Sequence, residues 1–81
     1  MLMVTAEQVK KHLVANGWKQ DIEFKNKNLM VFEYENSGFK IAIPSSEEYA
    51  DFERGLLRVL DTIADFEGKT SEQVIIEMLE N

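Results

Sequence analysis

The stretch from Ser45 to Glu67 constrains the fold more than any other part of this chain. Apolar residues recur in it three and four positions apart, which places them on one face of an α-helix. We therefore expect a long amphipathic helix whose apolar stripe packs on the rest of the chain. The stripe contains Tyr49, Phe52, Leu56, Val59, Leu60, Ile63 and Phe66.

Start and stop residues mark both ends of this predicted helix. Pro44 cannot continue a strand ladder, Ser45 and Glu48 have the spacing of a capping box, and Gly68 is suited to a left-handed stop. Gly55, in the middle, costs about 1 kcal/mol of helix propensity relative to alanine. Either another part of the backbone approaches closely there, or the long helix tolerates the glycine; we favour tolerance.

Two shorter helices are expected outside this segment. Thr5 and Gln8 have capping-box spacing and Asn16-Gly17 supplies a stop, which predicts a helix between them. The same Thr-x-Glu-Gln-Val pattern recurs at Thr70–Val74 and starts a second helix that runs to about Glu80. A helix this short is not stable alone, so it docks either on the preceding helix or on a second copy of the protein. Its apolar residues are Val74, Ile75, Ile76, Met78 and Leu79.

Between the first helix and the long one, the apolar period changes to two, which is typical of half-buried strands. The strands are expected over 18–25, 29–35 and 39–43, joined by turns at Asn26–Asn28 and Asn36–Gly38. The predicted fold is therefore a single α+β domain over residues 1–81, in the order α-β-β-β-α-α. It is a three-stranded antiparallel meander with helices packed on one face and a short extra C-terminal helix. The inward-facing residues would be Trp18, Gln20, Ile22, Phe24, Met30, Phe32, Tyr34, Phe39, Ile41 and Ile43.

The outward face of this sheet is charged except for Leu29, Val31 and Ala42. Three explanations are open for these apolar residues. They are scattered surface residues, which are normal in soluble proteins, or the C-terminal helix covers them, or they contact another chain. Because Ile76 of the last helix points away from the Val74 edge, we also expect a contact there. The candidate partner or dimer contacts are Leu29, Val31, Ala42, Ile76 and Leu79.

Composition limits the partners that this chain can have. The net charge of −6 and the pI of about 4.7 disfavour binding to nucleic-acid phosphates and fit a protein that meets a basic partner. Lysines concentrate in the first third of the chain, so a nucleic-acid-binding surface on the first helix and hairpin is the alternative. These lysines are Lys10, Lys11, Lys19, Lys25 and Lys27.

The same composition bears on location and on metal binding. The absence of cysteine excludes disulfides, thiolate metal sites and a nucleophilic thiol. No apolar run approaches the roughly 20 residues of a membrane span, and Met1–Val4 is too short for a signal peptide. We therefore expect a cytoplasmic protein.

The titratable residues do not form a recognisable catalytic or metal-binding pattern. His12 is the only histidine and has neither a nucleophile nor further ligands near it in sequence, so we interpret it as a boundary residue on a surface helix. Asp61 and Asp65 lie one turn apart, which suits a solvated acidic edge better than a cation site. Asp51 with Arg54 and Arg58 with Asp61 have the spacing of helix-surface ion pairs. We therefore expect no catalytic, cofactor-binding or metal-binding residues.

Several residues between positions 9 and 60 nevertheless resemble a known toxin family. The run Asn16-Gly17-Trp18-Lys19, followed by Phe32, Gly38 and Pro44 in the order helix, three strands, helix, is similar to the HicA-type mRNA interferases. The resemblance implies a fold like that of double-stranded-RNA-binding domains and a protein partner of the toxin–antitoxin kind.

The chain departs from this family at its catalytic residue. The family's histidine lies in a Gly-Ser-His stretch that leads into the second strand. Matching Phe32 to the family's aromatic position places Leu29 at the histidine and Lys27-Asn28 at Gly-Ser. Leucine has no imidazole chemistry, so the resemblance does not imply RNA cleavage. We therefore expect a non-catalytic, acidic protein-interaction module: a regulatory or antitoxin-like protein that binds a basic partner or a second copy of itself.

Overall fold

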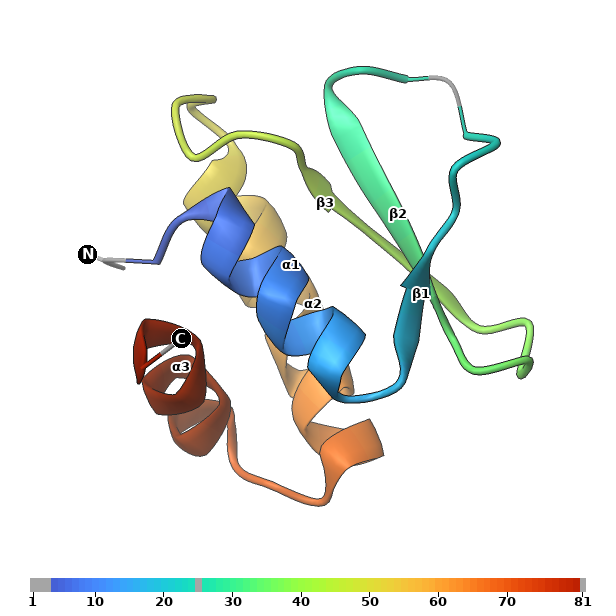
Figure 1. The fold of residues 1–81 in the computed structure, drawn as a ribbon. Helices are drawn as coiled ribbons and strands as arrows, with labels where there is room; N and C mark the ends of the chain where they lie inside the picture. Colours follow the sequence, from blue (N-terminus) through green and yellow to red (C-terminus); the bar gives the residue numbers. More distant parts are fainter. Residues whose placement is uncertain (1–3, 25, 81) are drawn as a thin grey trace.

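The fold is the predicted α+β arrangement (Figure 1). The structure is a computed structural model and describes residues 4–24 and 26–80. The three strands form one antiparallel sheet in the order β1-β2-β3, which confirms the meander. The elements are α1 (Ala6–Ala15), β1 (Trp18–Gln20), β2 (Leu29–Tyr34), β3 (Lys40–Pro44), α2 (Phe52–Glu67) and α3 (Ser71–Glu80).

The helices α1 and α2 cover one face of the sheet, and α3 lies on the side of these helices that faces away from the sheet (Figure 1). Val74 and Met78 of α3 are fully buried in the same core as the other elements, so α3 docks within its own chain. The core is built from Val4, Ala6, Val9, Leu13, Trp18, Phe32, Ile41, Ile43, Phe52, Leu56, Leu60, Ile63, Ala64, Val74 and Met78.

Both short helices begin with the predicted capping chemistry. The Thr5 hydroxyl accepts the N–H of Gln8 at 3.1 Å, and the Gln8 side chain accepts the N–H of Thr5 at 2.9 Å. Thr70 and Gln73 make the same pair of bonds at the start of α3, at 3.1 and 3.0 Å. Each pair satisfies donors that a helix start otherwise leaves without partners.

The first strand is shorter than its alternating pattern predicts. β1 ends at Gln20, and Ile22, predicted to face inward, is 85% exposed; Phe24 is also exposed. The reason is local: the Asp21 carboxylate accepts the N–H of Glu23 at 3.0 Å, and the Asp21 carbonyl accepts the N–H of Phe24 at 3.3 Å. Such an aspartate turn replaces the strand ladder. Lys25 lies outside the described residues.

The long helix begins later than predicted, at Phe52 instead of Ser45. The expected capping box does not form, because the Ser45 hydroxyl donates to the Lys27 carbonyl at 2.7 Å and the N–H of Glu48 donates to the Ser46 hydroxyl at 3.1 Å. The segment before α2 therefore packs as a loop, and Tyr49 is exposed outside the apolar stripe.

The aromatic residues at the far end of the stripe form a cluster at the edge of the core. Phe66 is only partly covered, and its ring lies 5.4 Å from that of Trp18, 4.6 Å from Tyr34 and 5.1 Å from Phe39. Phe39, predicted to face inward, is exposed apart from this contact. Trp18 itself is fully buried.

Gly55 marks a close approach between α2 and β3, so the interpretation as simple tolerance is wrong. A Cβ atom added at Gly55 would lie 2.8 Å from Cδ of Pro44, closer than Cβ atoms approach in proteins, and 3.2 Å from Cγ of Pro44. The neighbour is a proline ring and not another backbone. The N–H of Ser45 donates to the carbonyl of Asn28, and the N–H of Tyr34 donates to the carbonyl of Phe39. In this register the nitrogen of Pro44 faces the free edge of β3, where a strand needs no N–H donor, so a proline is tolerated there.

Candidate functional site

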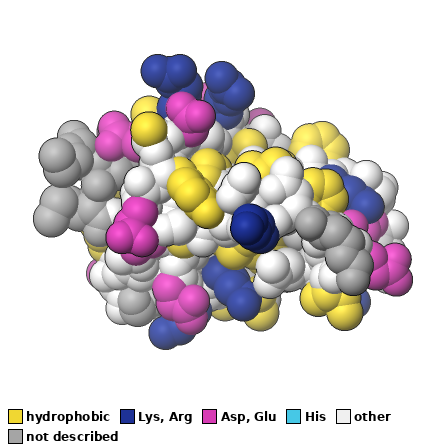
Figure 2. Space-filling model, turned by 90° about the horizontal axis from the view of Figure 1, so that it is seen from above, with side chains coloured by type: hydrophobic (Ala, Val, Ile, Leu, Met, Phe, Trp, Pro, Cys, Tyr) yellow, Lys and Arg dark blue, Asp and Glu magenta, His cyan; other side chains and the backbone are white. Residues whose placement is uncertain are grey.

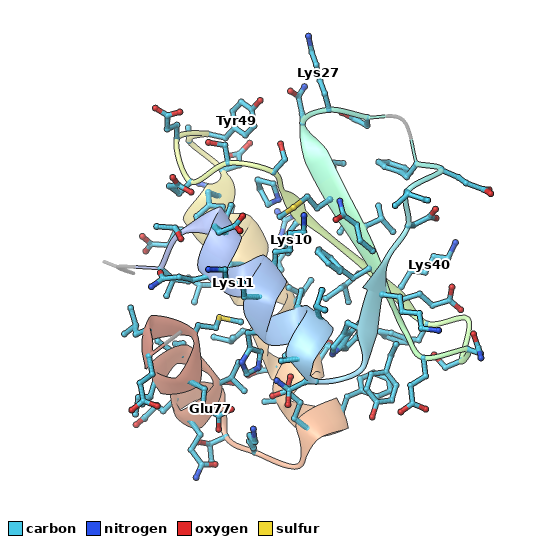
Figure 3. All side chains as sticks on the ribbon, in the orientation of Figure 1. Lys10, Lys11, Lys27, Lys40, Tyr49 and Glu77 are labelled. Atoms are coloured by element: carbon cyan, nitrogen blue, oxygen red, sulfur yellow. The ribbon has the colours of Figure 1, made fainter. Side chains whose placement is uncertain are left out.

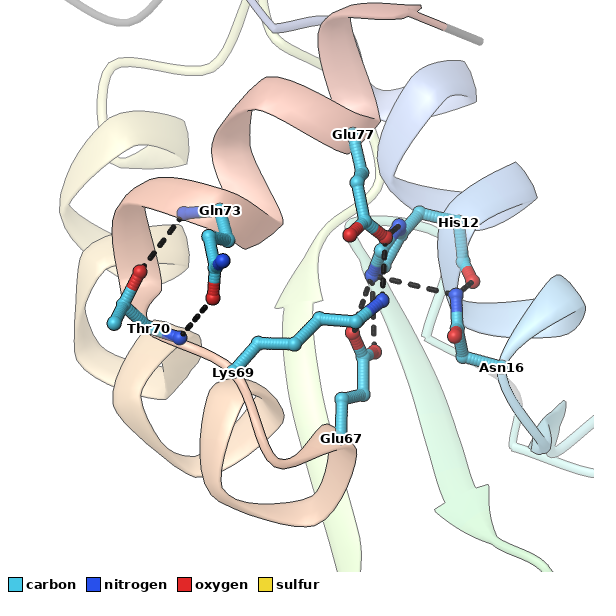
Figure 4. Close-up of polar contacts among 7 residues, drawn as sticks. All are labelled: His12, Asn16, Glu67, Lys69, Thr70, Gln73 and Glu77. Carbon is cyan, nitrogen blue, oxygen red and sulfur yellow. Dashed lines mark hydrogen bonds and ion pairs between the residues drawn. The ribbon is translucent and has the colours of Figure 1, made fainter.

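Two regions outside the apolar core bring polar groups together. The first, which we name the His12 cluster, consists of His12, Glu67, Lys69 and Glu77 from the three helices and the α2–α3 link (Figure 4). The second, the arginine groove, lies between α2 and the outward face of the sheet.

His12 and Glu67 form a buried pair at the centre of the His12 cluster. His12 Nε2 lies 2.8 and 2.9 Å from the two carboxylate oxygens of Glu67, and the side chains are 1% and 3% exposed. Because an ionised carboxylate only accepts hydrogen bonds, the geometry assigns the donated hydrogen to Nε2. The interpretation of His12 as a surface boundary residue is therefore wrong, since α3 covers this side of α1.

Lys69 and Glu77 close the solvent side of the His12 cluster. Lys69 Nζ lies 2.6 Å from Oε1 of Glu77 and 3.8 Å from Oε1 of Glu67, and the hydrogen bond that Lys69 donates to Glu77 raises the pKa of Lys69 above its usual value. Glu77 Oε1 is also 4.0 Å from Nδ1 of His12. A carboxylate therefore faces each nitrogen of the buried imidazole.

The donor atoms of His12, Glu67 and Glu77 lie within 4.8 Å of one another, close enough to surround a metal ion. The ammonium of Lys69 already contacts both carboxylates, so the arrangement satisfies its charges without a metal. Asn16 Nδ2 donates to the His12 carbonyl at 2.8 Å and steadies the end of α1. The geometry is that of a hydrogen-bond and ion-pair network that joins the helices, with no open position for a substrate.

The arginine groove has an apolar floor and charged walls. Its volume is about 360 Å³, and it is open to solvent at the α2 side of β3. The floor comes from β2, β3 and α2, and the packing of Gly55 on Pro44 forms its base. The lining residues are Leu29, Ala42, Pro44, Asp51, Arg54, Gly55, Arg58 and Val59.

Arg54 and Arg58 are the only two arginines of this chain, and both line the groove. The predicted ion pairs with Asp51 and Asp61 are wrong: no ion pair or hydrogen bond joins either arginine side chain to another residue of 4–24 or 26–80. Asp61 instead accepts the hydroxyl hydrogen of Ser71 at 2.6 Å. Two exposed cations one helical turn apart therefore stand beside an apolar floor.

The predicted contact residues fall into two surfaces. Leu29 and Ala42 line the arginine groove, and Val31, which pairs with Ala42 in the sheet, is buried on the same face. Ile76 and Leu79 are exposed on α3, at 53% and 44%. The explanation that the C-terminal helix covers Leu29, Val31 and Ala42 is wrong. The helix α3 packs on α1 and α2, on their side away from the sheet (Figure 1).

The lysines of the predicted basic surface come from separate elements, and Lys25 lies outside the described residues. Lys10 and Lys11 lie on α1, whereas Lys27 stands at the tip of the β1–β2 connection and Lys40 on the far strand (Figure 3). Lys40 is paired with Asp21 at 3.2 Å. Figure 2 shows the cations of one face at several separate places, divided by apolar and acidic side chains.

Sequence reasoning missed both regions for different reasons. His12 and Glu67 are 55 positions apart, and nothing in the sequence joins them. The sequence did contain a signal for the groove: its two arginines are the only ones in an acidic chain, and they are spaced by one helical turn.

Comparisons with protein-family models, curated proteins and solved structures found no match to this chain. Among the described residues, no helix is both long enough and apolar enough to cross a bilayer. The likeness to the HicA-type interferases therefore stays a prediction.

Proposed function

We propose that this protein is a non-catalytic protein-interaction module that binds a partner segment in the arginine groove. The observation that carries the proposal is the pair of side chains Arg54 and Arg58, which have no partner among the described residues and flank an open apolar floor. Exposed arginines over apolar surface are enriched where proteins bind one another.

The lining of the groove indicates the chemistry of the partner segment. The guanidinium group of arginine has a planar fork of donors that suits carboxylates, and its weak hydration lowers the cost of burying it. The floor of Leu29, Ala42, Pro44 and Val59 offers apolar contact. A segment that carries both carboxylates and apolar side chains fits this lining. The partner segment is thus acidic, although the net charge of the whole chain favoured a basic partner.

The His12 cluster does not supply an alternative activity. Its imidazole is covered and both of its nitrogens face carboxylates, so it has no free position toward a substrate. We therefore assign this cluster to stability and the groove to binding.

The proposal is tested with a double charge reversal, Arg54→Glu with Arg58→Glu, and a matched control, Lys10→Glu with Lys11→Glu, which changes the charge by the same amount elsewhere. Wild type and both variants are immobilised and incubated with extract of the cells that produce the protein, with wild-type protein added. Retained proteins are quantified by mass spectrometry.

We expect wild type and the lysine variant to retain the same partner, and the arginine variant to lose it, because a groove with two carboxylates repels an acidic segment. Retention of the same proteins by all three, or of none by wild type, would overturn the proposal. Circular dichroism checks that the variants are folded.

A further inference from the structure

We propose that the segment bound in the arginine groove is the outward face of α3 from a second copy of this chain. This inference rests on the proposed function and names the partner. It follows from the side chains that α3 leaves exposed while its inner face is held in its own core.

The outward face of α3 is an apolar stripe with a carboxylate at each end. Ile76 and Leu79 are about half exposed, and Glu72 and Glu80 are exposed beside them. Position 76 lies four residues after position 72, three before position 79 and four before position 80, so the four residues share one face of the helix. We name this surface the α3 stripe. Its spacing is typical of helices that dock in grooves of other proteins.

The inner face of α3 shows why the stripe is available without any unfolding. Val74 and Met78 are completely buried, and Glu77 is held by Lys69 at 2.6 Å. The helix is thus fixed on its own chain, and its stripe is presented in an ordered form. Binding of a second copy then costs little conformational entropy.

Charge and apolar character of the two surfaces are complementary. The α3 stripe offers carboxylates around apolar side chains, and the groove offers Arg54 and Arg58 around an apolar floor. The groove also contains Asp51, so its local balance is one positive charge in a chain whose net charge is −6. Complementary potentials of this kind give specificity and speed to association.

The most exposed apolar side chain of the described residues, that of Ile22 at 85%, fits the groove less well than the α3 stripe does. Ile22 lies between Asp21 and Glu23, but the carboxylate of Asp21 is already paired with Lys40 at 3.2 Å. The α3 stripe has no lysine or arginine within its helix, so its carboxylates stay available to another chain.

Because the two surfaces differ, the stripe of one copy binds the groove of another copy. Reciprocal use by two copies gives a closed twofold dimer, and non-reciprocal use gives a longer chain of copies. Both require the same pair of surfaces.

A charge-swap experiment tests this pairing. One variant carries Arg54→Glu and Arg58→Glu, so its groove and its stripe are both acidic. A second variant carries Glu72→Arg and Glu80→Arg, so its groove and its stripe are both basic. Sedimentation velocity measures the association of each, from about 5 to about 500 μM at low salt, where charge effects are largest.

We expect wild type to associate, and each variant alone to associate about tenfold more weakly or worse, because like charges then face each other. An equimolar mixture of the two variants restores association, since acidic grooves meet basic stripes and basic grooves meet acidic stripes. The Lys10→Glu/Lys11→Glu control associates as wild type does.

A monomeric wild type over this range, undiminished association of either variant, or a mixture that does not recover would overturn the inference. If wild type is monomeric but Arg54 and Arg58 are still needed to capture a different protein, the inference fails and the proposed function stands. If neither association nor capture depends on these arginines, both fail.

Discussion

The His12 cluster and the arginine groove place charged side chains in opposite circumstances. In the cluster, the side chains of His12 and Glu67 are removed from water and lie within hydrogen-bond distance of each other. In the groove, Arg54 and Arg58 are exposed beside an apolar floor and have no partner among the described residues. The first region uses its charges within the fold, and in the proposed function the second offers them to another molecule.

The difference follows from the cost of burial. A charge moved out of water is tolerated only when partners and hydrogen bonds replace its hydration, so the cluster had to be complete within the chain. Glu67 is also the last residue of α2, where the helix dipole disfavours a carboxylate, and His12 and Lys69 offset this. Exposed arginines keep their hydration, so they need no partner within the fold.

The largest expected effect is the loss of the buried pair. Glu67→Ala leaves the ring of His12 buried without its acceptor, and we expect it to lower the free energy of unfolding by about 3 kcal/mol. Urea denaturation measures this change. Asp65→Ala, which removes an exposed carboxylate of the same helix, is the control and changes stability little.

Replacing both partners sharpens this result. His12→Leu with Glu67→Met removes both buried polar side chains together, and we expect most of the lost stability to return. A single Glu67→Ala variant as stable as the Asp65→Ala control would show that the pair is not buried in solution, and the contrast between the two regions would disappear.

A smaller effect is expected at the base of the groove. Gly55→Ala gains about 1 kcal/mol of helix propensity but forces its Cβ against the ring of Pro44, an overpacking that costs about 1–3 kcal/mol. We expect a net loss of about 1 kcal/mol by urea denaturation. In a Pro44→Ala background the same change is expected to stabilise, because the ring is gone. The same sign in both backgrounds would contradict the close packing.

A pH-dependent effect is expected at Glu47 in the loop before α2. The N–H of Ala6 donates to the carboxylate of Glu47 at 2.8 Å, which lowers the pKa of Glu47 below its ordinary value of 4.5. Because the pKa of Glu47 is lower in the folded state than in the unfolded state, its ionised carboxylate stabilises the fold at pH values above the unfolded-state pKa. This contribution is lost as the pH falls through the folded-state pKa.

Glu47→Gln tests this contribution. We expect its melting temperature to lie below that of wild type at neutral pH, and the gap to narrow as the pH falls below about 4.5. Glu48→Gln, the next residue of the loop, is the control. A gap that stays constant from neutral to acid pH would count against the contact with Ala6.

The smallest effect on stability is expected for Arg54 and Arg58, the residues whose replacement we expect to weaken binding most. Arg54→Ala and Arg58→Ala remove side chains that contact no charged group of the described chain, so we expect changes within about 0.5 kcal/mol in urea denaturation. A loss of about 2 kcal/mol would mean that the arginines support the fold, and the assignment of the groove to binding would weaken.

Predictions from the sequence succeeded where neighbours along the chain decide the structure. Thr5 with Gln8 and Thr70 with Gln73 formed their capping boxes, and Asn36–Gly38 turned the chain between β2 and β3. They failed where a different hydrogen bond replaced the one that the local pattern predicted. Ser45 capped no helix because its hydroxyl reached Lys27, and Ile22 left the sheet because the turn at Asp21 ended β1.

The amino-acid sequence alone determined the order of helices and strands, the antiparallel meander and the central part of each apolar face, because these depend on periodicity and on contacts three or four residues apart. The tertiary structure alone decided that His12 meets Glu67, that Pro44 occupies the space left by Gly55, and that Arg54 and Arg58 have no partner among residues 4–24 and 26–80. Each of these depends on how elements distant in sequence pack, and side-chain spacing along one element carries no information about its neighbour in space.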